Sequence, residues 1–373
     1  MRIVMFGHKR IPSREGGVEI VVEELSTRMA ALGHTVTCYN RSGHHASGLK
    51  YKNRNGLRLW KGVILKTVPT LDKKGLAAVT SSFFAALRAA FSECDVVHIH
   101  AEGPAFMCWL PKLLGKRVVV TVHGLDWQRE KWKGGVGAKY IRLGEKMAVR
   151  FADEIIVLSR NVQAYFLRTY GRQTVWIPNG ISEPTIAEAN LISREFGLKK
   201  DDYFLFLGRL VPEKEIHTLI EAFRCVHTDK KLVIAGGTSD TDDYVNRLHA
   251  LAATDDRVIF TGFVQGQLLE ELYSNGYVYV LPSAVEGMPL SLLEAMSYGN
   301  CCVVSDIAEC TEVVENRAVT FPKGDVKALA ACLQRLCDDE ETVRSYKEHA
   351  RDYICGKYSW DDVAEQTLKL YRK

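Results

Sequence analysis

The sequence predicts an α/β fold built from two doubly wound parallel sheets. The chain has 373 residues, which exceeds one ordinary core and suits two domains of about 180 residues each. Short β-branched runs alternate with helical patterns along the whole chain. These runs are largely apolar, which is typical of strands buried on both faces of a parallel sheet.

The candidate strands form two series. In the first half they are Arg2–Phe6, Thr35–Tyr39, Val96–Ile99, Arg117–Val122 and Glu154–Leu158. In the second half they are Tyr203–Leu207, Lys231–Ala235, Val258–Thr261, Tyr277–Leu281 and Cys301–Ser305. Helical patterns such as Gly17–Leu32 and Ala138–Phe151 lie between the strands. The same alternation therefore occurs twice, once in each predicted domain.

The boundary between the two series is expected at Ile177-Pro178-Asn179-Gly180, where Pro and Asn-Gly interrupt the pattern. The charge changes sign there: residues 1–180 hold 28 Lys and Arg against 13 Asp and Glu, a net +15, whereas residues 181–373 carry a net −11. A basic first half indicates an anionic surface or substrate, and drift in surface charge is the alternative. Ligands of open α/β sheets bind beyond the carboxyl ends of the strands, so the active site is expected between the domains.

The composition is that of a soluble globular protein, with 47% hydrophobic and 25% charged residues. The ten cysteines are scattered without disulfide or metal spacing, which favours a reduced, cytoplasmic location and no structural zinc. The first residues are predicted to form a strand and not a signal peptide. No apolar run reaches the length of about 18 residues that a membrane span requires.

The segment Ser283–Glu294 combines a strand end, a loop and a helix start. Pro289 suits the first turn of a helix, which leaves the backbone N–H groups of Gly287, Met288 and Leu290 as donors for an anion or a hydroxyl group. Glu286 on the loop and Glu294 in the helix are placed to hold two groups of one polyhydroxylated ligand. The alternative is one surface carboxylate and one carboxylate on a helix face.

The segment Gly208–Lys214 lies between the strand Tyr203–Leu207 and a helix expected to begin near Glu215. Arg209 and Lys214 thus stand at the carboxyl end of a strand, where two cations can hold a diphosphate. Such a pair removes the need for a divalent metal, and no metal site is predicted. The alternative for both cations is a salt bridge with a neighbouring glutamate.

Two segments of the first half also follow strands. Gly16 and Gly17 stand at a helix start, where glycine lets the backbone approach a phosphate, although a glycine pair alone is a weak signal. The spacing is not Gly-x-Gly-x-x-Gly, which argues against a dinucleotide-binding domain. His123 is expected at the rim of the cleft. His98 and His100 alternate on another strand; we expect them on opposite faces and assign them no role.

In this order and spacing, the segments resemble the retaining glycosyltransferases of family 4, the group 1 set with the GT-B fold. The resemblance covers essentially the whole chain. It rests on Gly-Gly-Val-Glu (16–19), His-Gly (123–124), Pro-Asn-Gly (178–180), Gly-Arg-Leu-Val-Pro-Glu-Lys (208–214), Gly-Gly (236–237), Gly-Phe (262–263) and Glu-x7-Glu (286–294). It implies Rossmann-like domains at 1–180 and 181–355 that face each other across a cleft. A final helix at 356–373 would cross back to the first domain.

The resemblance also implies the site. The residues implied to bind the donor are Gly16, Gly17, Arg209, Lys214, Val264, Glu286, Gly287, Met288, Leu290 and Glu294, and those implied to act in catalysis are His123, Arg209, Lys214 and Glu286.

Each implied role has its own chemistry. Arg209 and Lys214 would bind the donor diphosphate and stabilise the leaving group. Glu294 would hold the ribose and Glu286 the sugar hydroxyls, with His123 near the reacting carbon. Gly16 and Gly17 would approach from the opposite wall, and the loop 262–264 would lie against the base.

Members of this family retain the anomeric configuration through front-face attack, with the departing phosphate accepting the proton of the acceptor. Charge stabilisation and positioning then lower the barrier. The sequence departs from the family at Glu215, where relatives often have glycine. A carboxylate in the first turn of a helix is favourable, so we expect the site to tolerate it.

The segments Arg10–Gly17 and Val21–Leu25 are similar to rhamnosyltransferase-like enzymes of bacterial polysaccharide assembly. This similarity implies a UDP- or dTDP-sugar donor and a saccharide acceptor, free or linked to polyprenyl diphosphate. The +15 of the first half favours contact with an anionic membrane. Aromatic and basic residues also mingle in Trp127–Lys133, which suits a membrane interface, an acceptor wall or an ordinary surface loop.

Three other functions are alternatives to sugar transfer. A nucleotide-sugar epimerase could use the same fold, but it needs no acceptor site. A non-catalytic binding module is disfavoured by the completeness of the donor motifs. Nucleic-acid modification draws only on the basic first half and lacks any groove-reading element. No cofactor is predicted.

Overall fold

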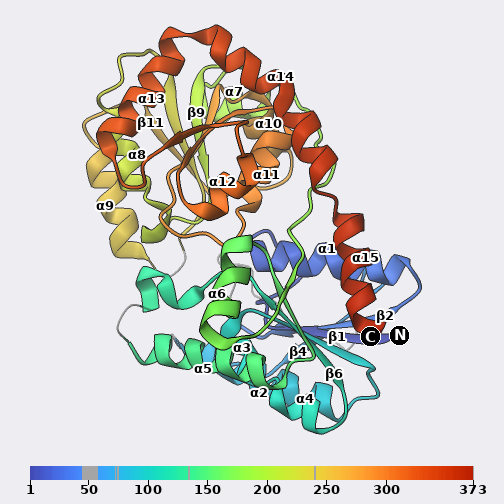
Figure 1. The fold of residues 1–373 in the computed structure, drawn as a ribbon. Coiled ribbons are helices and arrows are strands. Elements are labelled where there is room, and N and C mark those ends of the chain that lie inside the picture. Colours follow the sequence, from blue (N-terminus) through green and yellow to red (C-terminus); the bar gives the residue numbers. More distant parts are fainter. Residues whose placement is uncertain (44–57, 72, 74, 133–134, 239–240, 373) are drawn as a thin grey trace. The chain divides into compact units, whose positions relative to one another are not determined.

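The computed structural model describes residues 1–43, 58–71, 73, 75–132, 135–238 and 241–372 (Figure 1). The chain divides into two compact units. Unit 1 comprises Met1–Gly180 with Trp360–Lys373, and unit 2 comprises Ile181–Ser359. Both are α/β layers with helices on parallel sheets, which confirms the predicted fold class.

Within the described residues, unit 1 holds an eight-stranded sheet in the order β3-β4-β2-β1-β5-β6-β7-β8. The strands are β1 (Arg2–Phe6), β2 (Thr35–Arg41), β3 (Arg58–Trp60), β4 (Val63–Val68), β5 (Val96–His100), β6 (Arg117–Val122), β7 (Glu154–Val157) and β8 (Val175–Trp176). All neighbours are parallel except β3 and β4. The carboxyl ends of β1, β5 and β6 therefore lie side by side.

The helices of unit 1 pack on this sheet (Figure 1). They are α1 (Gly17–Ala31), α2 (Leu76–Ala90), α3 (Glu102–Ala105), α4 (Trp109–Leu113), α5 (Val136–Phe151), α6 (Arg160–Tyr170) and α15 (Trp360–Arg372), with short 3₁₀ turns η1 (Asp126–Gln128) and η2 (Glu130–Trp132). The last helix, α15, packs on α1 and β6. Its expected start at residue 356 lies inside the preceding helix, which ends at Lys357.

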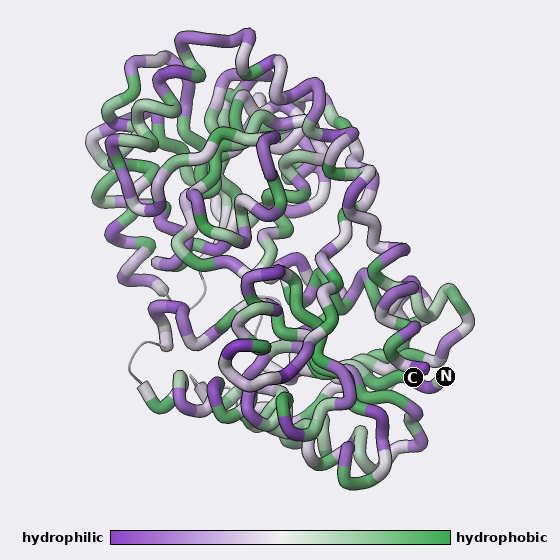
Figure 2. The backbone as a smooth tube through the Cα atoms, viewed as in Figure 1, coloured by the Kyte–Doolittle hydropathy of each residue, from purple (hydrophilic) through white to green (hydrophobic). Residues whose placement is uncertain are grey.

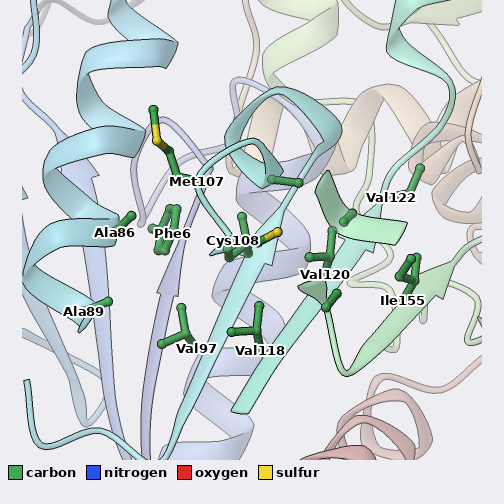
Figure 3. Packing of buried hydrophobic residues seen from close by; sticks show 14 of the residues in the cluster. Phe6, Ala86, Ala89, Val97, Met107, Cys108, Val118, Val120, Val122 and Ile155 are labelled. Atoms are coloured by element: carbon green, nitrogen blue, oxygen red, sulfur yellow. The ribbon is translucent and has the colours of Figure 1, made fainter. Parts of the chain in front are cut away.

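A core of small and β-branched side chains joins sheet and helices in unit 1. Figure 3 shows Phe6, Val97, Val118 and Ile155 from neighbouring strands on the side where Ala89 of α2 packs. Alanines on α2 let that helix approach the sheet closely, and each large buried side chain contributes about 1.5–3 kcal/mol. The core thus holds the ends of the central strands in fixed positions.

Unit 2 holds, among the described residues, a six-stranded parallel sheet in the order β11-β10-β9-β12-β13-β14. The strands are β9 (Tyr203–Leu207), β10 (Lys231–Ala235), β11 (Val258–Gly262), β12 (Val278–Leu281), β13 (Cys301–Ser305) and β14 (Val319–Phe321). The strands β9 and β12 are neighbours although far apart in sequence. The loops that follow them consequently emerge together.

The helices of unit 2 alternate with its strands. They are α7 (Leu191–Phe196), η3 (Pro212–Lys214), α8 (Ile216–Phe223), α9 (Asp242–Ala252), α10 (Gln267–Asn275), α11 (Leu290–Ser297), α12 (Ala308–Val314), α13 (Val326–Asp338) and α14 (Glu340–Lys357). Figure 2 shows hydrophobic residues concentrated along the inner strands of both units. Within the described residues, no helix is long and apolar enough to cross a membrane.

Candidate active site

The loop after β9 is tied to the loop after β10 by backbone hydrogen bonds. The N–H of Gly208 donates to Ala235 O at 3.0 Å, and the N–H of Leu210 donates to Gly237 O at 3.0 Å. Gly236 has φ +154°, and a Cβ there would lie 1.8 Å from Gly208 O. Glycine is therefore required for the two loops to meet, and this contact fixes the path of the chain around Arg209.

Lys214 and Glu286 meet at the carboxyl ends of β9 and β12. Nζ of Lys214 lies 2.5 Å from Oε1 of Glu286, and their side chains are only 12% and 9% exposed. The N–H of Ala284 donates to Glu213 O at 2.9 Å, which holds the two loops together. The structure thus joins two residues that are 72 positions apart and that were selected from separate motifs. A partly buried cation beside a carboxylate can bind a phosphate and a hydroxyl group of one ligand.

Glu294 lies in α11, whose N-cap is Pro289. Its Oε2 accepts a hydrogen bond of 3.0 Å from the hydroxyl of Tyr273 in α10. Burial raises the pKa of Tyr273 well above its ordinary value, with Glu294 adding to the effect, so the phenol remains a donor. Tyr273 fixes the Glu294 carboxylate, and sequence reasoning did not identify it because a tyrosine on a helix carries no motif.

The remaining donor-binding candidates of unit 2 surround these groups. Gly287, Met288 and Leu290 are buried beside Glu286 on the loop that enters α11. Val264 is buried after β11, where Phe263 packs against Gly237: a Cβ on that glycine would lie 3.5 Å from Cβ of Phe263. The loop 262–264 therefore lies against the segment that follows β10.

In unit 1, Gly16 is the N-cap of α1 and Gly17 its first residue. A Cβ on Gly16 would lie 2.5 Å from Oε2 of Glu19. Glu19 is 5% exposed, and its Oε1 accepts a hydrogen bond of 2.7 Å from the N–H of Lys9. Gly16 therefore makes room for a carboxylate that folds back to hold the loop after β1.

His123 lies directly after β6 and is 8% exposed. Its Nε2 is 3.1 Å from Nδ1 of His100, the last residue of β5. Burial lowers the pKa of His123 from 6.5 to about 4, although Asp126 and Glu19 oppose this shift. At neutral pH the ring is uncharged, so it can donate or accept a hydrogen bond but cannot act as a cation.

The expectation that His98 and His100 point to opposite faces is wrong. Their ring centroids are 4.2 Å apart. Residues two apart on a strand share a face because side chains alternate with a period of two. Gly7 was also missed: its φ is +111°, and a Cβ there would lie 2.1 Å from His100 O.

Glu215 also differs from expectation. It is the N-cap of α8, which begins at Ile216, and it is not in the first turn of the helix. Its backbone is left-handed, with φ +53° and ψ +34°. Glycine adopts this conformation readily, which is a physical reason for glycine at this position.

The candidate residues therefore form two groups. One group, at the carboxyl edge of the sheet in unit 2, holds Arg209, Lys214, Val264, Glu286, Gly287, Met288, Leu290 and Glu294. The other group, in unit 1, holds Gly16, Gly17 and His123. Among the described residues, no cluster of three or more His, Cys, Asp or Glu side chains is placed to hold a metal ion.

In a comparison with known proteins, each half of the chain matches a glycosyltransferase family model. Residues 15–183 match the model described as Glycosyltransferase Family 4, and residues 189–353 match the model described as Glycosyl transferases group 1. An uncharacterized glycosyltransferase of Methanocaldococcus jannaschii is 28% identical over 302 residues, which cover 74% of this chain and 75% of that protein. Alpha-maltose-1-phosphate synthase of Mycolicibacterium smegmatis is 28% identical over 310 residues, covering 74% and 79%.

Solved structures agree with the fold. Sucrose-phosphate synthase from Thermosynechococcus elongatus has a TM-score of 0.84 at 22% identity, covering 100% of this chain and 98% of that one. The Anabaena protein HepE in complex with UDP-glucose has a TM-score of 0.80 at 17% identity, covering 99% and 98%.

The fold and the two matches define a glycosyltransferase with the GT-B fold. The chain belongs to the group 1 and family 4 glycosyltransferases, with a family 4 domain followed by a group 1 domain.

Proposed function

We propose that the chain is a retaining glycosyltransferase that moves a hexose from a nucleotide sugar, UDP- or dTDP-linked, to a saccharide or a polyprenyl-diphosphate-linked saccharide in cell-surface polysaccharide assembly. The observation that carries the proposal is the Lys214–Glu286 pair at the carboxyl ends of β9 and β12. A phosphate-binding cation and a hydroxyl-binding carboxylate at one point suit the junction between diphosphate and sugar. The UDP-glucose complex of HepE, on the same fold, supports a nucleotide-sugar donor.

In the proposed reaction the acceptor hydroxyl attacks the anomeric carbon on the face that the diphosphate leaves. The C–O bond to the phosphate breaks as the new glycosidic bond forms, and the acceptor proton passes to the departing phosphate. Arg209 and Lys214 stabilise the negative charge that develops on the leaving group. Glu286 and Glu294 orient the sugar and the ribose, and neutral His123 donates to a sugar oxygen.

Lys214→Ala is expected to reduce transfer by at least about 100-fold, because one charge-stabilising contact on a leaving group contributes about 3 kcal/mol to the barrier. The assay measures release of the nucleotide from a set of nucleotide sugars. Lys231→Ala, at the start of β10, is the matched control and should transfer normally.

Near-normal turnover of Lys214→Ala would contradict the phosphate site. The same assay with a chelator tests metal independence, since complete loss of activity would contradict a site built on two cations. Incubation with donor alone distinguishes the alternative, a nucleotide-sugar epimerase, because only an epimerase would return an altered nucleotide sugar.

We further propose that unit 1 contacts an anionic membrane through α5. Its exposed side chains include Lys139, Arg142, Lys146 and Arg150, together with Val136, which is 83% exposed. The only acidic residue of this helix, Glu145, is fully buried. An exposed face with cations and apolar groups but no carboxylate suits an anionic lipid surface. Of the candidate stretch Trp127–Lys133, Lys133 lies outside the described residues.

The double variant Lys139→Ala/Lys146→Ala should bind anionic vesicles about 30-fold more weakly, at about 1 kcal/mol for each cation. Flotation with phosphatidylserine vesicles at two salt concentrations measures this. Lys199→Ala/Lys200→Ala, two exposed lysines of unit 2, is the matched control. Equal flotation of both double variants would exclude α5 as the contact surface.

A further inference from the structure

A column of four buried rings crosses unit 1 beneath the carboxyl edge of its sheet. It consists of His123 after β6, His100 and His98 on β5, and Tyr371 in α15. The His123 and His100 ring centroids are 5.3 Å apart, and those of His100 and His98 are 4.2 Å apart. Tyr371 closes the column with its hydroxyl 2.5 Å from Nδ1 of His98. His98 and His100 are 0% exposed and His123 is 8% exposed, so His123 is the most exposed histidine of the column.

All three histidines are neutral at physiological pH. Burial lowers the pKa of His98 to about 3 and that of His123 to about 4, and it lowers the pKa of His100 well below its ordinary value. A neutral imidazole carries one N–H, so two rings that face each other nitrogen to nitrogen must hold complementary tautomers. Either Nδ1 of His100 donates to Nε2 of His123, or the reverse holds.

The other nitrogen of His100 decides between these arrangements. Within the described residues, Nε2 of His100 is buried without a hydrogen-bond partner. If the His100 proton were on Nε2, a buried N–H would be left without an acceptor, which is rarer and costlier than an acceptor with no donor. The proton therefore belongs on Nδ1 of His100, which donates to His123. His123 then carries its own proton on Nδ1, the nitrogen that does not face His100.

The far end of the column is held by the last helix. Nε2 of His98 lies 2.7 Å from Oγ1 of Thr121, so both His98 nitrogens have a hydroxyl partner. Arg117 Nε donates to Leu370 O at 2.7 Å, which fixes the end of α15 beside Tyr371. His98, held on both sides, in turn packs against the His100 ring and limits its rotation.

We propose that His100 is a positioning residue that presents His123 as a neutral donor with its proton on Nδ1, and that Tyr371 secures this arrangement through His98. The hydrogen bond from His123 to a sugar oxygen rests on the proposed function. The tautomer itself does not, because it follows from contacts within unit 1. The last helix thereby acts on the chemistry of His123 through the rings of His98 and His100.

The test is ¹⁵N–¹H correlation NMR on histidine-labelled full-length protein, with signals assigned by single His→Gln variants. The wild-type spectrum should show His123 with its proton on Nδ1, unchanged between pH 6 and 8. A proton on Nε2, or titration of the ring in that range, overturns the proposal without any variant.

His100→Phe keeps a ring in the column and removes both nitrogens. We expect averaged His123 nitrogen shifts and a loss in kcat of about tenfold, with the donor KM within about twofold of wild type. Tyr371→Phe should cause a smaller loss in kcat and only partial averaging of the two His123 nitrogen shifts. Tyr353→Phe, which removes a half-buried hydroxyl donating to Val313 O in unit 2, is the control and should change neither quantity.

A His123 signal that keeps its Nδ1–H signature in His100→Phe overturns the positioning role. The NMR spectrum is recorded without a nucleotide sugar, so it does not depend on the proposed function. If the predicted tautomers are found in a protein that shows no transferase activity, only the proposed function is refuted. Transfer activity with the wrong tautomer would refute the positioning role alone.

Discussion

At the residue scale, Glu215 combines a backbone cost with a side-chain gain. A left-handed conformation costs an L-residue about 1–2 kcal/mol relative to glycine. Its carboxylate offsets part of this by accepting a hydrogen bond of 2.7 Å from the hydroxyl of Thr218. The residue next to the proposed phosphate-binding lysine is thus held in place by its side chain and not by its backbone preference.

Glu215→Asn should raise the free energy of unfolding of unit 2 by about 0.5–1 kcal/mol, because asparagine tolerates the left-handed region better than glutamate does. Glu215→Ala should lower it by about 1 kcal/mol, since alanine keeps the strain and loses the hydrogen bond from Thr218. Urea denaturation followed by circular dichroism measures both. Equal stability of the two variants would show that neither the backbone strain nor the Thr218 hydrogen bond affects stability here.

At the element scale, α3 and α5 pack so closely that a Cβ on Gly144 would lie 2.0 Å from Glu102 O. The contact buries two carboxyl groups, Glu102 and Glu145, both 0% exposed. Burial, with the nearby charges of Asp126 and Glu145 and a hydrogen bond to Glu145, raises the pKa of Glu102 well above its ordinary value. The raised pKa favours the protonated form of Glu102, whose proton forms a hydrogen bond to Glu145. Its Oε2 accepts a hydrogen bond of 2.9 Å from the N–H of Asp126, three residues after His123.

The pH dependence has a definite sign. Because the pKa of Glu102 is higher in the folded than in the unfolded protein, its contribution to stability is present below the unfolded value of 4.5 and is lost as the pH rises toward the folded value. Glu102→Gln keeps a donor to Glu145 and an acceptor for Asp126 without a titrating proton. As the pH rises above 4.5, the wild type should lose up to about 1.4 kcal/mol of free energy of unfolding for each pH unit relative to the variant, until the folded pKa is reached.

Glu145→Gln is the contrasting variant. Oε1 of Glu145 accepts from Tyr165 at 2.8 Å and also from Tyr170, and an amide cannot replace this acceptor capacity while also accepting from Glu102. It should be less stable at every pH, by about 1 kcal/mol for each hydrogen bond lost. If the free energy of unfolding of Glu102→Gln falls with pH in parallel with that of the wild type, the hydrogen-bonded proton of Glu102 is contradicted.

At the scale of the whole molecule, unit 1 collects the buried histidines. Burial lowers the pKa of His8 to about 4, as it lowers those of His98, His100 and His123. All six tryptophans of the chain, residues 60, 109, 127, 132, 176 and 360, also belong to unit 1. Tryptophan fluorescence therefore reports the unfolding of unit 1 selectively.

Unit 1 should lose stability in mild acid. The folded pKa of each of these histidines lies below the unfolded value of 6.5, so their contribution is present above pH 6.5 and is lost as the pH falls toward 4. Each should lower the free energy of unfolding by about 1 kcal/mol between pH 6.5 and 5.5. Urea denaturation followed by fluorescence measures this, with His349→Asn, an exposed histidine of unit 2, as the control. A free energy that is constant over this range would contradict the buried neutral column.

Much of the fold was predictable because the central strands are buried on both faces. Strands such as Arg117–Val122 and Lys231–Ala235 have the bounds expected from their apolar runs. The strands that were missed are β3, β4, β8 and β14, which lie toward the edges of the sheets. Of these, β3, β8 and β14 span only two or three residues. Strands near a sheet edge bury less apolar surface, so their sequences show a weaker apolar pattern.

The sequence by itself determined two parallel α/β layers and the chemistry at their strand ends, because buried strands need apolar runs and loops at strand ends carry the polar groups. Lys214 and Glu286 could each be selected from their own motifs. That they meet at 2.5 Å depends on β9 and β12 being neighbours, and pairing between distant strands leaves no trace in either segment.

Only the tertiary structure decided what supports these residues. Tyr273 donates a hydrogen bond to Glu294, and no motif connects the two helices involved. The same holds for the residues that support His123, which are His100, His98 and Tyr371. They act through close contacts in the buried interior, where hydrogen bonds and burial set the tautomer and the charge of each group. Sequence patterns record which groups are present, whereas three-dimensional contacts determine the protonation state in which they act.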